Sequence, residues 1–131
     1  MKRGYVVLVL ATSLGLVVAA CGGGGEPSKP SGTQSPADRG RQLANAQGCL
    51  GCHSTDGSAL VGPTWKSMYG HEVKLANGQT ATADDAYITE SIYEPDSKVV
   101  QGFPSGTMPS FKGTLSSQDV QAIIEYIKTL R

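Results

Sequence analysis

The clearest hydrophobic pattern lies at the C-terminal end of the chain. Ser116 and Asp119 have the spacing of a helix capping box. Apolar side chains then recur at intervals of three and four residues, which is the period of one helix face. They are Val120, Ile123, Ile124, Ile127 and Leu130. The pattern predicts a terminal helix with one apolar face, and Tyr126 lies beside that face.

A second helix is predicted to begin at about residue 36. Ser35 is a good N-cap and Pro36 suits the first helical position, so we expect a helix from Ala37 to about Gln47. Its apolar stripe is narrow and consists of Gly40, Leu43 and Ala44. Small residues on this face would let another helix approach closely.

A third helix is expected between these two. Thr82 with Asp85 would cap it, and Pro95 would end it. Its inner side would consist of Tyr87, Ile88, Ser91 and Ile92. Because no sustained run of alternating polar and apolar residues occurs, the fold is predicted to be all-α with long glycine-bearing loops.

The first 20 residues differ from the rest of the chain. Lys2 and Arg3 precede an almost uncharged apolar stretch at 5–20, and small residues lead up to Cys21. The apolar stretch is short for a permanent membrane-spanning helix. We therefore expect residues 1–20 to be a cleaved signal peptide.

The junction at residues 18–21 resembles the signal of bacterial lipoproteins, in which the cysteine receives a diacylglycerol before cleavage. Cys21 would then be a lipidated N-terminus, and residues 21–35, rich in glycine, proline and serine, would form a flexible tether. Two alternatives remain, namely an uncleaved anchor helix and a plain signal peptide whose cysteine is incidental.

Composition limits what the remaining residues can form. The chain has 131 residues and a formal net charge of zero, which fits one small domain at 36–131. Its 17 glycines and low aromatic content predict a thin apolar core that a buried cofactor would supplement. Without Lys2 and Arg3 the chain keeps nine basic and eleven acidic residues, so nothing supports nucleic-acid binding.

The candidate chemistry lies in Cys49-Leu50-Gly51-Cys52-His53. This spacing lets Cys49 and Cys52 take the two vinyl groups of haem as thioethers, while His53 binds the iron. A thioredoxin-like redox pair and half of a zinc site are the alternatives. A zinc site would need Cys21 or His71 to complete it, and the chain lacks the alternating strand-helix pattern typical of thioredoxin.

Residues 36–131 resemble the class I monohaem cytochromes c. The resemblance rests on five features in the expected order: Ala37-Asp38-Arg39-Gly40, the CLGCH motif, Val61-Gly62-Pro63, Thr107-Met108-Pro109 and the terminal helix. It implies three to five helices packed around one covalently attached haem c. It also implies that the first and last helices cross where Gly40 meets Tyr126.

Met108 is the expected sixth iron ligand. It lies in a proline-braced loop at 103–109, and Pro109 keeps it out of helical geometry. Its position before the last helix resembles the ligand loop of the family. The alternative is a methionine that only fills apolar space, and Met68 and His71 are the rival ligands.

The resemblance also implies roles for residues around the iron ligands. The carbonyl of Pro63 would accept a hydrogen bond from the second ring nitrogen of His53 and so orient the ring. Trp65 and Tyr69 would line the haem edge or reach a propionate, with ordinary core packing as the alternative.

These features together predict a one-electron carrier of a bacterial respiratory chain. The resemblance implies that the iron cycles between Fe(III) and Fe(II), taking electrons from a quinol-oxidising donor and passing them to a terminal oxidase or other reductase. No catalytic residue and no small-molecule substrate are expected. No lysine-rich cluster surrounds the motif, so partners would dock through an apolar haem edge or by permanent association.

We expect the protein to be exported to the bacterial cell envelope and anchored through Cys21. It would lie on the outer face of the cytoplasmic membrane, in the periplasm or at the outer membrane. The sequence also resembles the cytochrome domain of subunit II of haem-copper oxidases and the monohaem lipoprotein subunits of quinol-oxidising complexes, so a permanently bound subunit is one alternative. A haem enzyme or gas sensor with a labile sixth ligand is a second, and a structural lipoprotein with an inert cysteine pair is a third.

Overall fold

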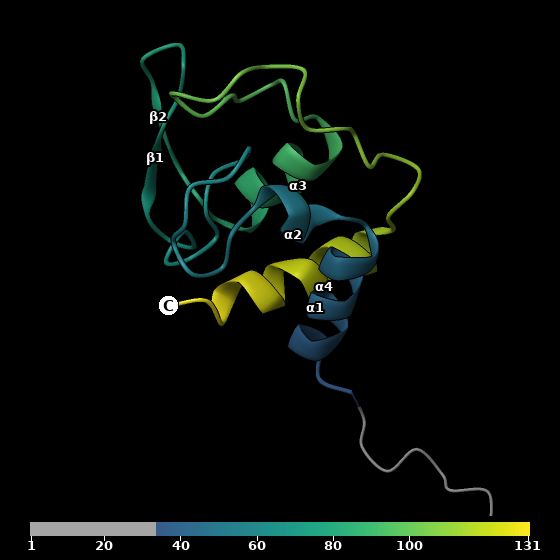
Figure 1. Cartoon of the computed structure of the whole chain (residues 1–131). Coiled ribbons are helices and arrows are strands. Elements are labelled where there is room, and N and C mark those ends of the chain that lie inside the picture. Colours follow the sequence, from purple (N-terminus) through teal and green to yellow (C-terminus); the bar gives the residue numbers. More distant parts are fainter. Residues whose placement is uncertain (1–33) are drawn as a thin grey trace, which may run out of the picture. The chain divides into compact units, whose positions relative to one another are not determined.

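The structure is a computed structural model that describes residues 34–131. The predicted signal peptide, Cys21 and residues 22–33 of the predicted tether lie outside the described residues. The elements are α1 (Pro36–Ala46), α2 (Cys49–Cys52), β1 (Glu72–Lys74), β2 (Thr80–Thr82), α3 (Asp85–Tyr93) and α4 (Ser117–Lys128) (Figure 1). Helices predominate in the described part, as the prediction of an all-α fold requires.

Side-chain caps fix where the predicted helices begin. The Ser35 hydroxyl accepts the amide of Asp38 at 3.1 Å at the start of α1. Ser116 and Asp119 form the expected capping box at the start of α4. The cap predicted for the third helix is wrong, because Asp84 and not Thr82 accepts the Tyr87 amide, at 2.8 Å. A carboxylate one residue before the helix also interacts favourably with the positive end of the helix dipole.

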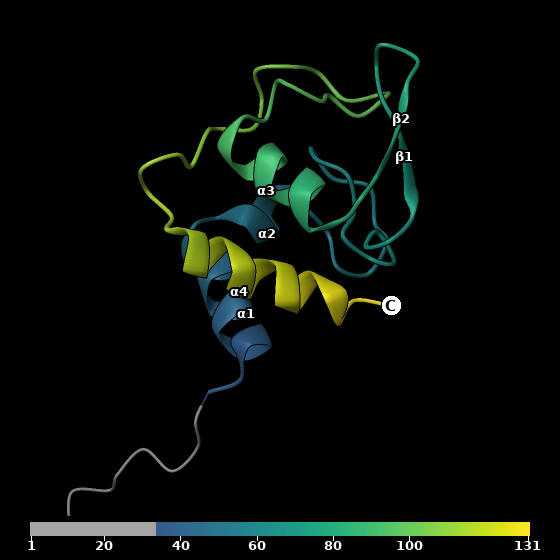
Figure 2. The same ribbon diagram turned by 180° about the vertical axis from the view of Figure 1, so that it is seen from behind.

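Helices α1 and α4 cross in close contact (Figures 1 and 2). Gly40 makes this possible, because a Cβ atom at that position would lie 1.8 Å from the backbone oxygen of Ala122 and 2.9 Å from the amide nitrogen of Ile123. The atoms nearest to Gly40 therefore belong to residues about one turn before Tyr126. The ring of Tyr126 packs edge-on against Trp65, with centroids 6.4 Å apart.

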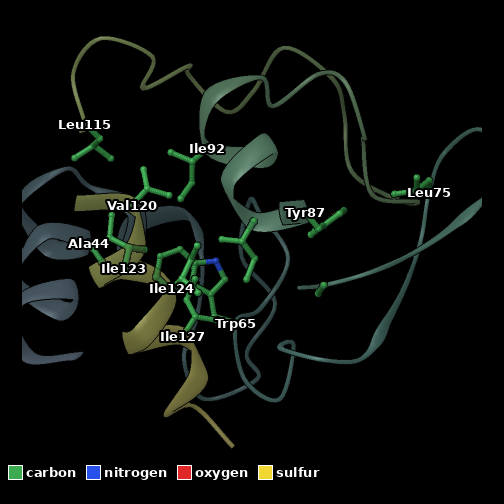
Figure 3. Close-up of a cluster of buried hydrophobic side chains, with 12 residues drawn as sticks. Ala44, Trp65, Leu75, Tyr87, Ile92, Leu115, Val120, Ile123, Ile124 and Ile127 are labelled. Carbon is green, nitrogen blue, oxygen red and sulfur yellow. The ribbon is translucent and has the colours of Figure 1, made fainter. Parts of the chain in front are cut away.

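The inner faces of the helices form one apolar cluster (Figure 3). The largest fully buried side chains all come from α4 and belong to the face predicted from its periodicity: Val120, Ile123, Ile124 and Ile127. Helix α3 contributes Tyr87, Ile88 and Ile92. Trp65, from the loop after the cysteine motif, is 6% exposed and joins this cluster. The core thus lies along α4, with α3 and the Trp65 loop packed against it.

The sequence did not lead us to expect the antiparallel hairpin of β1 and β2. Val73 pairs with Ala81, and the loop between the strands contains Asn77 and Gly78, the latter with a φ of 84°. Asn-Gly is a common hairpin signal, because both residues tolerate positive φ. Strands of three residues are too short to show an alternating pattern, so this dipeptide was the one usable signal.

A long segment without helices or β-strands, residues 94–116, connects α3 to α4. Figure 2 shows this segment running from α3 toward the hairpin and returning to the start of α4. Leu75, directly after β1, is bridged to Val100 in this segment. We call residues 94–116 the strap, since it contains Met108 and lies along one side of the functional site described below.

Replacement of Gly40 by alanine tests the helix crossing. The added methyl would overlap backbone atoms of α4, which cannot rotate away as a side chain can, so Gly40→Ala should lower the free energy of unfolding by about 2–3 kcal/mol. Urea denaturation of the haem-loaded protein measures this loss. Asn45→Ala, at an exposed position of the same helix, is the matched control and should change stability by less than about 0.5 kcal/mol. A Gly40→Ala protein as stable as the control would contradict the contact.

Candidate functional site

The cysteine motif lies at the end of α1. Gly48 adopts a left-handed conformation with a φ of 76°, which ends the first helix and starts the short helix α2. Cys49 and Cys52 are its first and last residues, and both have free thiols. Burial raises the pKa of the Cys49 thiol. Reactive pairs of the thioredoxin type need the opposite shift, so this environment suits a cysteine used for attachment.

The ring of His53 is fixed by a hydrogen bond to the backbone. Its Nδ1 lies 2.7 Å from the carbonyl oxygen of Pro63. A carbonyl can only accept, so Nδ1 carries the proton and Nε2 keeps a free lone pair. Burial lowers the pKa of His53, an effect that the bond to Pro63 partly opposes. A neutral ring with Nε2 available is the form that binds a metal ion.

Two further contacts hold the His53 ring in place. A Cβ atom on Gly62 would lie 2.7 Å from Cε1 and 2.9 Å from Nδ1 of His53, so only glycine lets the loop at 61–63 pass this close to the ring. Trp65 stacks on the ring with centroids 5.2 Å apart and planes inclined by 20°. Backbone bonds from Gly62 to Cys52 and from Trp65 to Ser54 keep this loop folded back on the motif. His53 is therefore oriented before any ligand binds.

An apolar cavity of about 230 Å³ lies beside these residues. An apolar hollow of this size, lined by a few polar groups, is typical of cofactor sites. Cys49, Cys52 and His53 line the cavity on one side, and α3, α4 and the strap supply apolar side chains that include Ile88, Ile123 and Phe111. The cavity thus combines two thiols and an imidazole with apolar walls.

Met108 also lines the cavity and is partly buried. It comes from the strap, 55 residues after His53, so the fold brings together groups that are distant in the sequence. Met68 lines the same cavity as well. It belongs to the same segment as Trp65, whose ring stacks on His53. The other rival ligand, His71, is exposed and is not part of the cavity lining.

The two aromatic residues singled out in the sequence have different surroundings. Trp65 lines the cavity. Tyr69 does not, because its hydroxyl donates to Asp85 at 2.6 Å and its ring lies beneath the ammonium group of Lys128, 4.9 Å away. Tyr69 therefore joins the loop after the motif to α3 and α4.

Two features of the site were missed in the sequence. Tyr87 and Lys98 both line the cavity, and a helix pattern alone does not show which inner side chains reach a cofactor. Asp96 accepts a hydrogen bond from the amide of Gly106 in the strap at 2.6 Å. Its position after Pro95 is typical of turn-forming aspartates and was the available signal.

The residues present fit a covalently attached haem. Two thiols separated by one helical turn face the same apolar cavity as an imidazole whose Nε2 is free, and a thioether is available from a separate segment. Soft sulfur and imidazole donors are ligands that haem iron accepts. Among residues 34–131, no three His, Cys, Asp or Glu side chains are arranged to hold a metal ion by themselves.

Comparison with known proteins agrees with this fit. Residues 37–131 match the family model described as cytochrome c. Cytochrome c2 iso-1 of Magnetospirillum fulvum is 33% identical to the chain, in a match that covers 63% of this chain and 91% of the relative. The iso-1 protein of Magnetospirillum molischianum is also 33% identical, with coverages of 63% and 90%. Cytochrome c2 of Rhodoplanes tepidamans is 26% identical, with coverages of 63% and 91%.

The family match supports haem attachment over the zinc and thioredoxin alternatives for the cysteine motif, and it agrees with the predicted fold. The chain belongs to the cytochrome c family as a class I monohaem protein with one covalently attached haem c, and it is a bacterial electron-transfer protein rather than an enzyme.

Proposed function

We propose that the protein is a one-electron carrier of a bacterial respiratory chain, in which His53 and Met108 would bind the haem iron and Cys49 and Cys52 would attach the haem through thioether bonds. The carrying observation is that His53, with Nε2 free, and Met108 line one apolar cavity although they come from distant segments. When bound, haem c supplies an iron that exchanges one electron between its ferric and ferrous forms.

The chain contributes an oriented histidine and largely apolar walls to this exchange. Pro63, Gly62 and Trp65 hold the His53 ring, so the ring need not reorient when the charge at the site changes. The hydrogen bond from Nδ1 to Pro63 also makes the imidazole a stronger donor. Methionine as the second axial ligand raises the potential relative to two histidines, which suits a carrier that accepts electrons from a quinol-oxidising donor.

The proposed binding of Met108 to the iron can be tested by a matched pair of substitutions. Met108→Ala should lower the reduction potential by on the order of 0.1–0.3 V, which is part of the ~0.8 V range that axial ligands cover. It should also abolish the methionine-iron charge-transfer band of the ferric protein. Met68→Ala removes the other thioether from the same cavity and should leave the band in place.

Three outcomes would revise the proposal. An unchanged potential and spectrum in Met108→Ala would remove Met108 from the ligand set. Loss of the band in Met68→Ala alone would assign the bond to Met68. Rapid binding of carbon monoxide by the reduced wild-type protein at neutral pH would favour the haem enzyme or gas sensor with a labile sixth ligand.

The surface near the cavity supports docking through apolar contact. Leu60 and Val61, at the start of the loop that holds His53, are 44% and 54% exposed, and Val61 also lines the cavity. Four cations of the described chain are engaged in ion pairs with its own carboxylates: Arg39, Lys98, Lys112 and Lys128. We propose that the partners, a quinol-oxidising donor and a terminal oxidase or reductase, offer an apolar patch to Leu60 and Val61.

The same exposed pair favours a second possibility, permanent association with a membrane oxidoreductase complex. Purification of the native protein from mild detergent distinguishes the two. A free carrier separates from the oxidase and the quinol-oxidising complex, whereas a subunit remains with one of them at constant stoichiometry.

We further propose that residues 1–20 are a lipoprotein signal peptide, that Cys21 is lipidated and that 21–35 are the tether of the domain at 36–131. The support is the sequence at the junction. No helix within residues 34–131 has the length and apolar character that crossing a bilayer requires. The anchor would keep the domain in the cell envelope, on the outer face of the cytoplasmic membrane or at the outer membrane.

Replacement of Cys21 tests the anchor. Cys21→Ser removes the thiol that would receive the diacylglycerol, so most of the haem-loaded protein should move from the membrane fraction to the soluble envelope fraction after a high-salt wash. Mass spectrometry of the wild-type protein should find acyl chains on an N-terminal Cys21. Retention of the Cys21→Ser protein in washed membranes would instead favour an uncleaved helix or a tightly bound partner.

A further inference from the structure

The strap holds Met108 with few contacts of its own. On either side of this residue, Pro104, Ser105, Gly106, Thr107 and Pro109 are all exposed. A segment with little burial and few hydrogen bonds opens at low free-energy cost. The Met108 thioether must therefore be held at the cavity by a few specific hydrogen bonds of the strap.

Backbone bonds fasten the strap on both sides of the loop that contains Met108. On the side of the hairpin, the amide of Ala76 donates to the Val99 carbonyl and the amide of Gln101 to the Lys74 carbonyl, both at 2.8 Å. On the other side, the amide of Phe111 donates to Ile92 at 3.1 Å. These bonds leave residues 102–109 as a loop that reaches out between two fixed points.

One side chain fastens the middle of this loop. The carboxylate of Asp96 accepts the amide of Gly106 at 2.6 Å. Among the hydrogen bonds of the described chain, this is the one that involves residues 104–109. Asp96 lies three residues after the end of α3, so its carboxylate ties Gly106, two residues before Met108, to the part of the strap next to that helix.

We propose that Asp96 is a positioning residue for Met108, whose carboxylate closes the strap through the Gly106 amide and so limits how often the thioether leaves the cavity. This inference rests on the axial role proposed for Met108. It assigns to Asp96 an effect on the lifetime of the methionine-iron bond, since Asp96 acts through the strap backbone.

The test compares Asp96→Ala with Asp96→Asn in the haem-loaded protein. Alanine removes the acceptor, whereas asparagine keeps a carbonyl oxygen at the same place. Ferric protein is mixed with excess imidazole in a stopped-flow instrument, where the limiting rate reports dissociation of the methionine. Loss of a hydrogen bond of ordinary net strength should raise this rate roughly three- to tenfold in Asp96→Ala, and the rate in Asp96→Asn should stay within about twofold of wild type.

Hydrogen exchange of the Gly106 amide gives a second readout that does not depend on the iron. Exchange should be faster in Asp96→Ala and nearly unchanged in Asp96→Asn. Ala76→Pro is an independent variant, because it deletes the amide bonded to Val99 at a turn position that accepts proline. It should also accelerate methionine dissociation, since it loosens the same strap.

Asp119→Ala separates strap opening from general loss of stability. It removes the Asp119 half of the α4 capping box and the ion pair with Arg39, and its bonds to the strap reach only Ser116, eight residues beyond Met108. It should lower the free energy of unfolding and leave the imidazole rate within about twofold of wild type. An equal acceleration in Asp119→Ala and Asp96→Ala would overturn the inference.

Two further outcomes distinguish failure of the positioning role of Asp96 from failure of the proposed function. Equal imidazole rates in Asp96→Ala and wild type, with the methionine-iron band present in both, overturn the positioning role while the proposed function stands. Absence of the band from the wild-type protein overturns both the axial assignment and the inference.

Discussion

The contact between the backbones of α1 and α4 at Gly40 is the constraint on which the rest of the structure depends. Helix α1 leads directly into the cysteine motif, and α4 provides the largest fully buried side chains of the core. Their crossing therefore sets the distance between the attachment cysteines and the apolar wall opposite them. A side chain at Gly40 would push these two parts of the site apart, although Gly40 itself is not among the residues that line the cavity.

The two proposed iron ligands are supported in different ways. His53 is held by a hydrogen bond, a stacked ring and a close backbone loop, all from residues within twelve positions of it. Met108 depends on a long strap whose fastening points lie on the hairpin, on α3 and on Asp96. The histidine side of the site is thus locally determined, whereas the methionine side depends on tertiary structure. Substitutions in distant parts of the chain would therefore displace Met108 before they displace His53.

The sequence predicts what is local and fails where geometry is tertiary. The period of α4 and its capping box identify this helix because they depend on residues three and four apart. The CLGCH motif likewise carries its own spacing. In contrast, the pairing of the hairpin with the strap involves residues 25 apart, and the Asp96–Gly106 bond crosses ten residues of loop. No periodic pattern records such contacts, and Asp84 replaced Thr82 as a cap because the hairpin used Thr82 as part of a strand.

The position of the cysteines on a short helix next to α1 determines what happens to the haem when the domain partly unfolds. The strap is the loosely held side, so partial opening under stress would begin there, while the attachment helix stays packed at the end of α1. A cofactor held only by its axial ligands could diffuse away at that moment. One bonded covalently to the opposite side remains in place until the strap returns. Covalent attachment thus makes a partial unfolding event reversible, because the haem is still in place when the strap closes again.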